Sequence, residues 1–280
     1  MKGKLFIPML ALAAVCVGCS SEDDLTVKDG AGKVRLGCEV SQTVAEVTSR
    51  AGQYELPAEL LPSTDQLTLA ITGSYTDETG STPFNKSWQT VADFVTENPD
   101  FEAGDYNSTE GKYQNSYAAV MTYGEATAEG EAKPYFVGES GDFTIYAGKT
   151  TQVATTVKLA NSCFTLAVTE WMLNYYDNLK LTIHTADNSF AFEPTTTAPS
   201  TLIFVKAGAT LSLSGSAVKS QTGTEVSFPQ TSLGQATAAG TKYDVVIDHG
   251  KAGGASLTVS FDDRFTEVAG EEIELNPDEK

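Results

Sequence analysis

The chain has few of the residues that most often build catalytic and metal sites. Its 280 residues include two histidines, four cysteines, four methionines and two tryptophans. Neither His184 nor His249 stands at a spacing typical of metal ligands, and no cysteine pair does, so we expect no zinc site. Complete phosphate-binding-loop and nucleophile-elbow patterns are also missing from the sequence. The sequence therefore predicts a protein that needs no metal or cofactor and is not an enzyme.

Basic residues are scarce as well. Lysine and arginine number 18 against 37 aspartates and glutamates, which gives a formal net charge of −19. A surface of this sign repels nucleic acid and the anionic faces of membranes. We therefore exclude nucleic acid as a partner, and any attachment to a membrane would have to come from lipid.

Long hydrophobic runs are missing except for a short one at the N-terminus. Lys2 and Lys4 precede an apolar stretch from Leu5 to Val17, which is shorter than the roughly 18 to 20 residues that span a bilayer. This pattern is typical of a signal peptide over residues 1–18. Its Val17-Gly18-Cys19 ending resembles the lipobox of bacterial lipoproteins, which implies cleavage between Gly18 and Cys19 and acyl chains, palmitate among them, on Cys19.

Two of the four cysteines would not remain as thiols in the mature protein, because Cys16 lies in the leader and Cys19 would carry lipid. Cys38 and Cys163 remain. An exported chain could oxidise them, but they fall in different predicted domains, and the dense cysteine framework of small secreted folds is missing. We expect two separately buried thiols.

Residues 19–32 read as a tether, since Ser20-Ser21-Glu22-Asp23-Asp24 is polar and acidic and the segment has little that could build a core. An acidic run after the lipid-bearing cysteine is similar to the signal that sends lipoproteins of Bacteroides-like bacteria to the outer face of the outer membrane. The alternative is a solvated linker whose charge carries no address.

Most of the chain shows the period-two alternation of half-buried strands, with Gly, Asn, Asp, Ser and Thr between the runs. We expect an all-β protein of two β-sandwich domains in series, at residues 33–158 and 159–280, because the alternation changes phase near Leu159. Helix is limited to short turns near residues 91–95 and 171–176. The alternating runs begin at Val34, Leu67, Phe143, Val153, Phe164, Leu179, Leu211, Val226, Tyr243 and Leu257.

Two long irregular stretches interrupt this pattern, at residues 96–114 and 124–133. Long loops in a compact domain are either functional or mobile.

Two further classes of function remain open from the residues alone. Exposed aromatic rings could stack on sugars, and the candidates are Trp88, Trp171, Tyr175 and Tyr176, although such rings more often lie in a core or an interface. A hydrolase would need two carboxylates facing across a cleft, which a sequence with 37 acidic residues cannot show.

Several segments together resemble the fimbrillin-like surface lipoproteins of Bacteroides-type bacteria, in particular an uncharacterised family, a domain of unknown function, related to the major and minor fimbrillins. The likeness covers the chain from Gly32 onward. The segments that carry it are Glu102–Tyr106, Met121–Gly124, Lys133–Gly138, Phe143–Val153 and Lys158–Ser162.

This resemblance implies a transthyretin-like first domain and display at the cell surface. In polymerising members a trypsin-like protease cuts after an arginine beyond the first strand, and a strand from the next subunit fills the groove that this strand leaves. Arg50, in Thr48-Ser49-Arg50-Ala51-Gly52, would be the scissile residue here. The alternative is an ordinary loop arginine. The removed piece would carry Val34, Leu36, Cys38 and Val40.

The C-terminal sequence departs from what a donor strand would need, because only Ile273-Glu274-Leu275 alternates before Asn276. A shaft, tip or anchor subunit and a lipoprotein that never polymerises all remain open. We therefore expect a lipid-anchored outer-membrane surface protein that acts in adhesion or as a pilus component, with pilus subunits and a host or glycan ligand as partners. The alternative is a glycan-binding lipoprotein that assists polysaccharide uptake.

Overall fold

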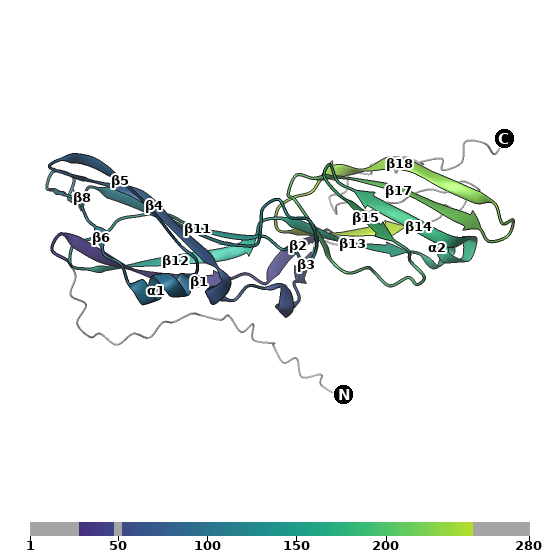
Figure 1. Ribbon diagram of the computed structural model, residues 1–280, viewed down its shortest axis with the longest axis horizontal. Helices are drawn as coiled ribbons and strands as arrows, with labels where there is room; N and C mark the ends of the chain where they lie inside the picture. The colour runs from purple at the N-terminus through teal and green to yellow at the C-terminus, as the bar shows by residue number, and fades with distance from the viewer. Residues whose placement is uncertain (1–27, 48–51, 249–280) are drawn as a thin grey trace, which may run out of the picture. The chain divides into compact units, whose positions relative to one another are not determined.

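The computed structural model describes residues 28–47 and 52–248, whose regular secondary structure is mainly β-strand (Figure 1). Two short α-helices, α1 (Val91–Glu97) and α2 (Glu170–Tyr175), and two single-turn 3-10 helices accompany the strands. The strands are β1 (Ala31–Val40), β2 (Thr43–Val47), β3 (Gly52–Glu55), β4 (Thr68–Asp77), β5 (Gly80–Trp88), β6 (Phe101–Glu102), β7 (Tyr106–Asn107), β8 (Lys112–Tyr113), β9 (Asn115–Tyr123), β10 (Gly130–Glu131), β11 (Phe136–Phe143), β12 (Thr150–Leu159), β13 (Ser162–Val168), β14 (Tyr176–His184), β15 (Ser189–Phe192), β16 (Ile203–Val205), β17 (Thr210–Lys219), β18 (Glu225–Ala236) and β19 (Thr241–Ile247).

The all-β prediction is confirmed, and the chain divides into two compact units. Unit 1 contains the chain up to Ser41 together with Pro62–Thr122 and Gly138–Val157. Unit 2 contains Gln42–Leu61, Tyr123–Val137 and the chain from Lys158 onward. The division is therefore not a single cut near residue 158, because two earlier segments belong with the later part of the chain. The transthyretin-like character of the first domain stays a prediction.

Unit 1 is built on one seven-stranded sheet in the order β5-β4-β9-β11-β12-β1-β6. In Figure 1, β4 and β5 lie along one side of this unit, and β1, β6 and β12 along the other. The sequence alternates through β12, where Val153, Val157 and Leu159 are buried and the residues between them are mostly exposed. Side chains of successive residues point to opposite faces of a strand, so this pattern places one face of β12 against the core.

Aromatic rings fill much of the core of unit 1. Phe101 lies 5.6 Å from Tyr117 and 6.3 Å from Phe94 between ring centroids. Phe84 of β5 lies 5.3 Å from Phe101, and Tyr117 is fully buried. Tilted and edge-to-face pairs at these distances add about 0.5–1.5 kcal/mol each beyond the burial of their area. The rings therefore tie β5, β6, β9 and α1 together.

The side chain of Asn115 holds two irregular segments beside this core. Its amide nitrogen donates to the carbonyls of Ala103 at 2.7 Å and Ile145 at 2.9 Å, and its carbonyl oxygen accepts from the Ile145 backbone nitrogen at 2.8 Å. An unpaired backbone group is costly to bury. Asn115 thus replaces the strand partners that Ile145 lacks after β11 ends at Phe143.

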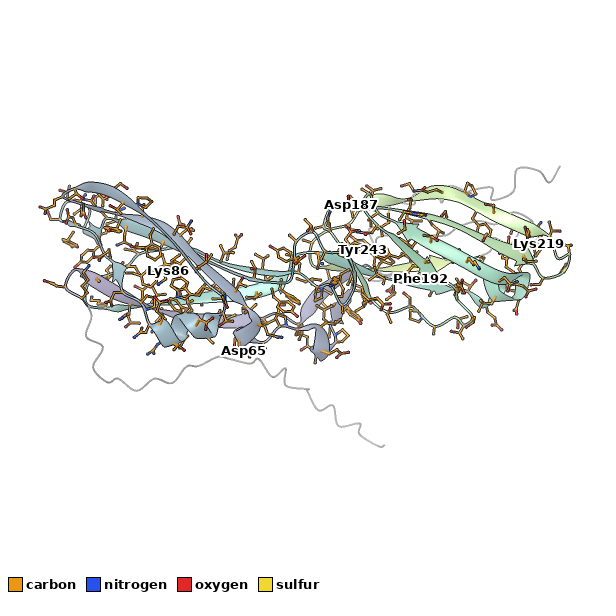
Figure 2. The ribbon with its side chains drawn as sticks, in the orientation of Figure 1. Asp65, Lys86, Asp187, Phe192, Lys219 and Tyr243 are labelled. Atoms are coloured by element: carbon orange, nitrogen blue, oxygen red, sulfur yellow. The ribbon has the colours of Figure 1, made fainter. Side chains whose placement is uncertain are left out.

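Unit 2 is a sandwich of two sheets around one core. The first sheet runs β10-β16-β13-β19-β2-β3 and the second runs β15-β14-β17-β18. The buried cluster takes alternate residues from both, such as Phe164 and Val245 from the first sheet and Leu181 and Phe228 from the second. Tyr243 of β19, labelled in Figure 2, belongs to the same cluster, and its hydroxyl accepts from the Ala238 nitrogen at 2.8 Å.

Glu129 explains why residues 123–137 belong to unit 2. Its carboxylate accepts hydrogen bonds from the Thr185 hydroxyl at 2.7 Å, the Asn188 amide at 2.9 Å and the Lys206 backbone nitrogen at 3.1 Å. β10 also pairs with β16. The expected irregular stretch at residues 124–133 is therefore held by hydrogen bonds to other residues of unit 2.

The expected helical turns are confirmed as α1 and α2, and each begins at a threonine whose hydroxyl caps the first turn, Thr90 and Thr169. The expected loop at residues 96–114 contains three two-residue strands, β6, β7 and β8. The run expected at Leu257 lies outside the described residues.

Gly73 of β4 provides a direct test of this packing. A Cβ atom added there would lie 2.3 Å from the carbonyl oxygen of Ser116 and 2.8 Å from the Cα of Tyr117, both backbone atoms of β9. We expect Gly73→Ala to lower the free energy of unfolding by about 1–3 kcal/mol. The measurement is chemical denaturation followed by circular dichroism.

Gly37 of β1 is the matched control, because its added Cβ would approach no atom closer than 3.8 Å. Gly37→Ala should change the stability by less than about 1 kcal/mol. Equal effects of the two substitutions would contradict the register of β4 against β9.

Candidate functional site

Strand β1 occupies an interior position in the sheet of unit 1, between β12 and β6. It runs parallel to β12, with Lys33 opposite Thr150 and Val40 opposite Val157. Three of its own residues, Ala31, Val34 and Cys38, are buried. The first described strand of the chain thus completes a sheet whose other members come from much later in the sequence.

A buried lysine fixes the start of β1. The Lys33 ammonium lies 2.7 Å from a carboxylate oxygen of Asp100 and donates to the carbonyl of Asn98 at 2.6 Å. Only 8% of the Lys33 side chain is exposed. Asn98 ends α1 in the left-handed conformation, with φ of 46°. A cation favours the carbonyl end of a helix, so Lys33 joins β1 to α1 as well as to Asp100.

The next strand, β2, belongs to unit 2, where it lies between β19 and β3. A second buried lysine, Lys242 of β19, holds the β2–β3 pair. Its ammonium lies 3.0 Å from Glu46 and 2.6 Å from Asp244, and 4.7 Å from the centre of the Tyr54 ring. Burial alone would lower the pKa of Lys242, but the hydrogen bonds and charges of Asp244 and Glu46 raise it above the usual value.

Cys38 and Cys163 are both buried and neither is in a disulfide, as expected. Burial raises the pKa of the Cys163 thiol to about 12. A thiol in this state is a poor nucleophile at neutral pH, because the thiolate is the reactive form. Cys38 and Cys163 therefore serve as small core residues.

Three predicted site residues, Gly18, Cys19 and Arg50, lie outside the described residues, as does His249. Lipid attachment at Cys19 and cleavage at Arg50 stay predictions. Arg50 falls in the segment 48–51 that connects β2 to β3.

The four aromatic residues expected to stack on glycans do not form one surface. Trp88 is buried in unit 1, where its indole nitrogen donates to Glu97 at 2.7 Å and its ring meets Phe94 edge-on at 5.0 Å. Tyr176 is buried in unit 2 against Phe228. Neither ring is open to a ligand, so the expectation of stacking is corrected for Trp88 and Tyr176. The physical reason is that both rings complete a hydrophobic core.

The other two aromatic candidates lie on α2. Trp171 is 71% exposed, and Tyr175 is half-buried with its ring centre 4.8 Å from that of Tyr176.

Other exposed aromatic residues escaped the sequence analysis. Tyr106 is 57% exposed and Tyr146 is 43% exposed. Tyr113 joins them, with ring centres 5.2 Å from Tyr106 and 6.1 Å from Tyr146. Tyr106 and Tyr113 face each other across the β7–β8 pair, whereas Tyr146 comes from a segment later in the chain that no local pattern links to them.

Within residues 28–47 and 52–248, no group of three or more His, Cys, Asp or Glu side chains is arranged to hold a metal ion. The helices of this described part are also too short or too polar to cross a membrane.

One family model matches residues 30–277, and its description is "Domain of unknown function (DUF4493)". The chain belongs to this family. The family match agrees with the expected membership in an uncharacterised domain family. No curated protein matches the sequence.

Solved structures with a similar trace come from Bacteroides species. A proposed cell adhesion protein from Bacteroides eggerthii has 10% identity and a TM-score of 0.40, over 88% of this chain and 94% of that one. Proposed polysaccharide-binding proteins (DUF1812) from Bacteroides thetaiotaomicron have 10% identity and a TM-score of 0.34, over 79% and 92%. A fimbrial protein from Bacteroides ovatus has 9% identity and a TM-score of 0.33, over 80% and 50%.

The ion pairs of Lys242 with Glu46 and Asp244 predict how the stability of the protein changes at alkaline pH. Lys242→Met removes the ammonium and leaves Glu46 and Asp244 without their shared cation. We expect the free energy of unfolding to fall by about 1–3 kcal/mol at pH 7. This is less than for a fully buried pair, because both carboxylates are partly exposed. The folded-state pKa of Lys242 is raised, so its contribution is present below pH 10.5 and is lost as the pH rises through the folded pKa.

The measurement is the difference in unfolding free energy between the native chain and Lys242→Met, followed by urea denaturation from pH 7 to pH 12. This difference should shrink above pH 10.5. A constant difference across that range would contradict a charged Lys242 as the cause. Lys180→Met is the matched control, since Lys180 makes an ion pair that is exposed on both sides, with Glu193.

Proposed function

We propose that this protein is a lipid-anchored component of a bacterial surface structure, acting in adhesion or as a pilus subunit. The lipobox-like ending at Cys19 and the fimbrillin-like segments of the sequence support this function. The two all-β units are compatible with it.

The observation that carries the proposal is the place of β1 in the sheet. Eight residues, Lys33 to Val40, pair with β12. Removing β1 would leave the facing edge of β12 without its partner and would open the space that Ala31, Val34 and Cys38 fill. An open edge beside apolar pockets accepts a complementary strand from another chain.

Cleavage after Arg50 would affect unit 2 as well. The released piece would contain β2 in addition to β1, and β2 pairs with β19 on one side and β3 on the other. Lys242 would lose Glu46 while keeping Asp244. One cut would thus open one strand position in each unit.

Arg50→Gln tests the proposal on cells that express the native protein. Material sheared from these cells is run on a denaturing gel without boiling. We expect the native chain to give a ladder of resistant multimers and Arg50→Gln to give a monomer band, because the uncut chain keeps β1 in its own sheet.

Arg35→Gln is the control, since Arg35 lies on an exposed position of β1 and precedes the expected cut. It should keep the ladder. A monomer band from the native chain would contradict a shaft subunit, and a ladder from Arg50→Gln would contradict cleavage at this residue as the switch.

A further inference from the structure

A hollow on the four-stranded sheet of unit 2 has a volume of about 1000 Å³. Residues from β14, β17 and β18 line it, together with Glu193, Pro194 and Thr195, which follow β15. Lys219, labelled in Figure 2 at one end of unit 2, is next in sequence to the lining residue Val218.

A bulge in β14 shapes this hollow. Asp177 pairs with Val218 and Lys180 with Ser216, so three steps along β14 match two along β17. Asn178 within the bulge has φ of 51°, a left-handed conformation that is uncommon outside glycine. β15 pairs with β14 only from Leu181 onward. This edge of β14 therefore faces the hollow in place of a neighbouring strand.

The strand register places polar side chains in two rows across the same face. Lys180, Ser216 and Ser227 are opposite one another in one row. Asp177, Val218 and Glu225 form the next row. Alternate residues of a strand share a face, so both rows point away from the core that buries Ala217.

The charged residues that line the hollow determine which class of ligand it can bind. The lining contains three carboxylates, those of Asp177, Glu193 and Glu225, and one ammonium, that of Lys180, which lies 3.7 Å from Glu193. This arrangement repels anionic ligands. A divalent cation is also unsuited, because no group of three metal-binding side chains comes together among the described residues.

The remaining chemistry fits a neutral, hydroxyl-rich molecule. Carboxylates accept hydrogen bonds, the ammonium donates, and the serine hydroxyls and the Asn178 amide do both. Leu173, Pro194 and Val226, which are partly exposed, add apolar surface to the lining. A few polar groups around an apolar patch are typical of small-molecule sites, and sugars offer both C–H faces and hydroxyl groups.

We propose that this hollow on β14, β17 and β18 is a binding site for a neutral oligosaccharide. Asp177 and Glu225 accept hydrogen bonds from sugar hydroxyls, and Ser216 and Ser227 offer hydroxyl groups in the adjacent row. The site lies within unit 2 and uses neither β1 nor Arg50, so it is separate from polymerisation.

The test is isothermal titration of the purified full chain with chitohexaose, mannohexaose, xylohexaose and maltohexaose. Tetragalacturonate and tetralysine serve as the anionic and cationic probes. We expect at least one neutral oligosaccharide to bind, and neither charged probe to bind as tightly.

The double variant Asp177→Asn with Glu225→Gln should weaken this binding at least tenfold, while its circular dichroism stays native because both changes keep the side-chain shape. Tyr106→Ala is the matched control, since its ring is exposed and does not line the hollow. It should change the affinity less than twofold.

Three results would overturn the proposal: no binding of any neutral probe, tighter binding of a charged probe, or equal binding by the native chain and the double variant. None of them affects the multimer ladder, which depends on β1. Failure of the sugar site and failure of the adhesion or pilus proposal are therefore distinguishable.

Discussion

Unit 1 depends on the pairing of β1 with β12. These two strands run parallel although more than a hundred residues separate them in the chain. Parallel strands cannot be joined by a tight turn. Pairing β1 with β12 therefore closes a long loop, which costs conformational entropy. Its stabilisation comes from eight facing positions and from the buried side chains of Ala31, Val34 and Cys38. Lys33 adds an ion pair with Asp100 and a hydrogen bond to the end of α1. Strand β1 thus completes the sheet and is tied to α1 at its start.

Local alternation was enough to predict most of the longer strands, but it missed β5, β9 and the short strands. The run at Val153 predicts β12 because a single buried face repeats every second residue. The prediction failed at Ile145, which alternates with Phe143 but lies beyond the end of β11. Asn115, thirty residues earlier, satisfies both backbone groups of Ile145, and no local pattern reveals such a contact.

The partners of each strand could not be predicted in the same way. β2 follows β1 closely in sequence, yet it pairs with β19 in the other unit. Lys242 shows the difficulty for single residues, since a lysine in an alternating strand normally reads as a solvent-facing position. Its burial depends on Glu46, Tyr54 and Asp244, and two of these come from a distant segment. Trp88 could not be assigned to core or surface from the sequence for a related reason, because the exposure of a tryptophan in a strand depends on neighbours that are distant in the chain.

The central claim is that β1 is an integral strand of the unit 1 sheet, held at its start by Lys33 and Asp100. Hydrogen–deuterium exchange of the full chain, read by mass spectrometry, tests it directly. The claim predicts that the amides of residues 33–40 are protected about as strongly as those of residues 150–157, and that Asp100→Asn speeds exchange in β1 without changing β13 or β19. Fast exchange in β1 beside a protected β12, or no response to Asp100→Asn, would contradict it.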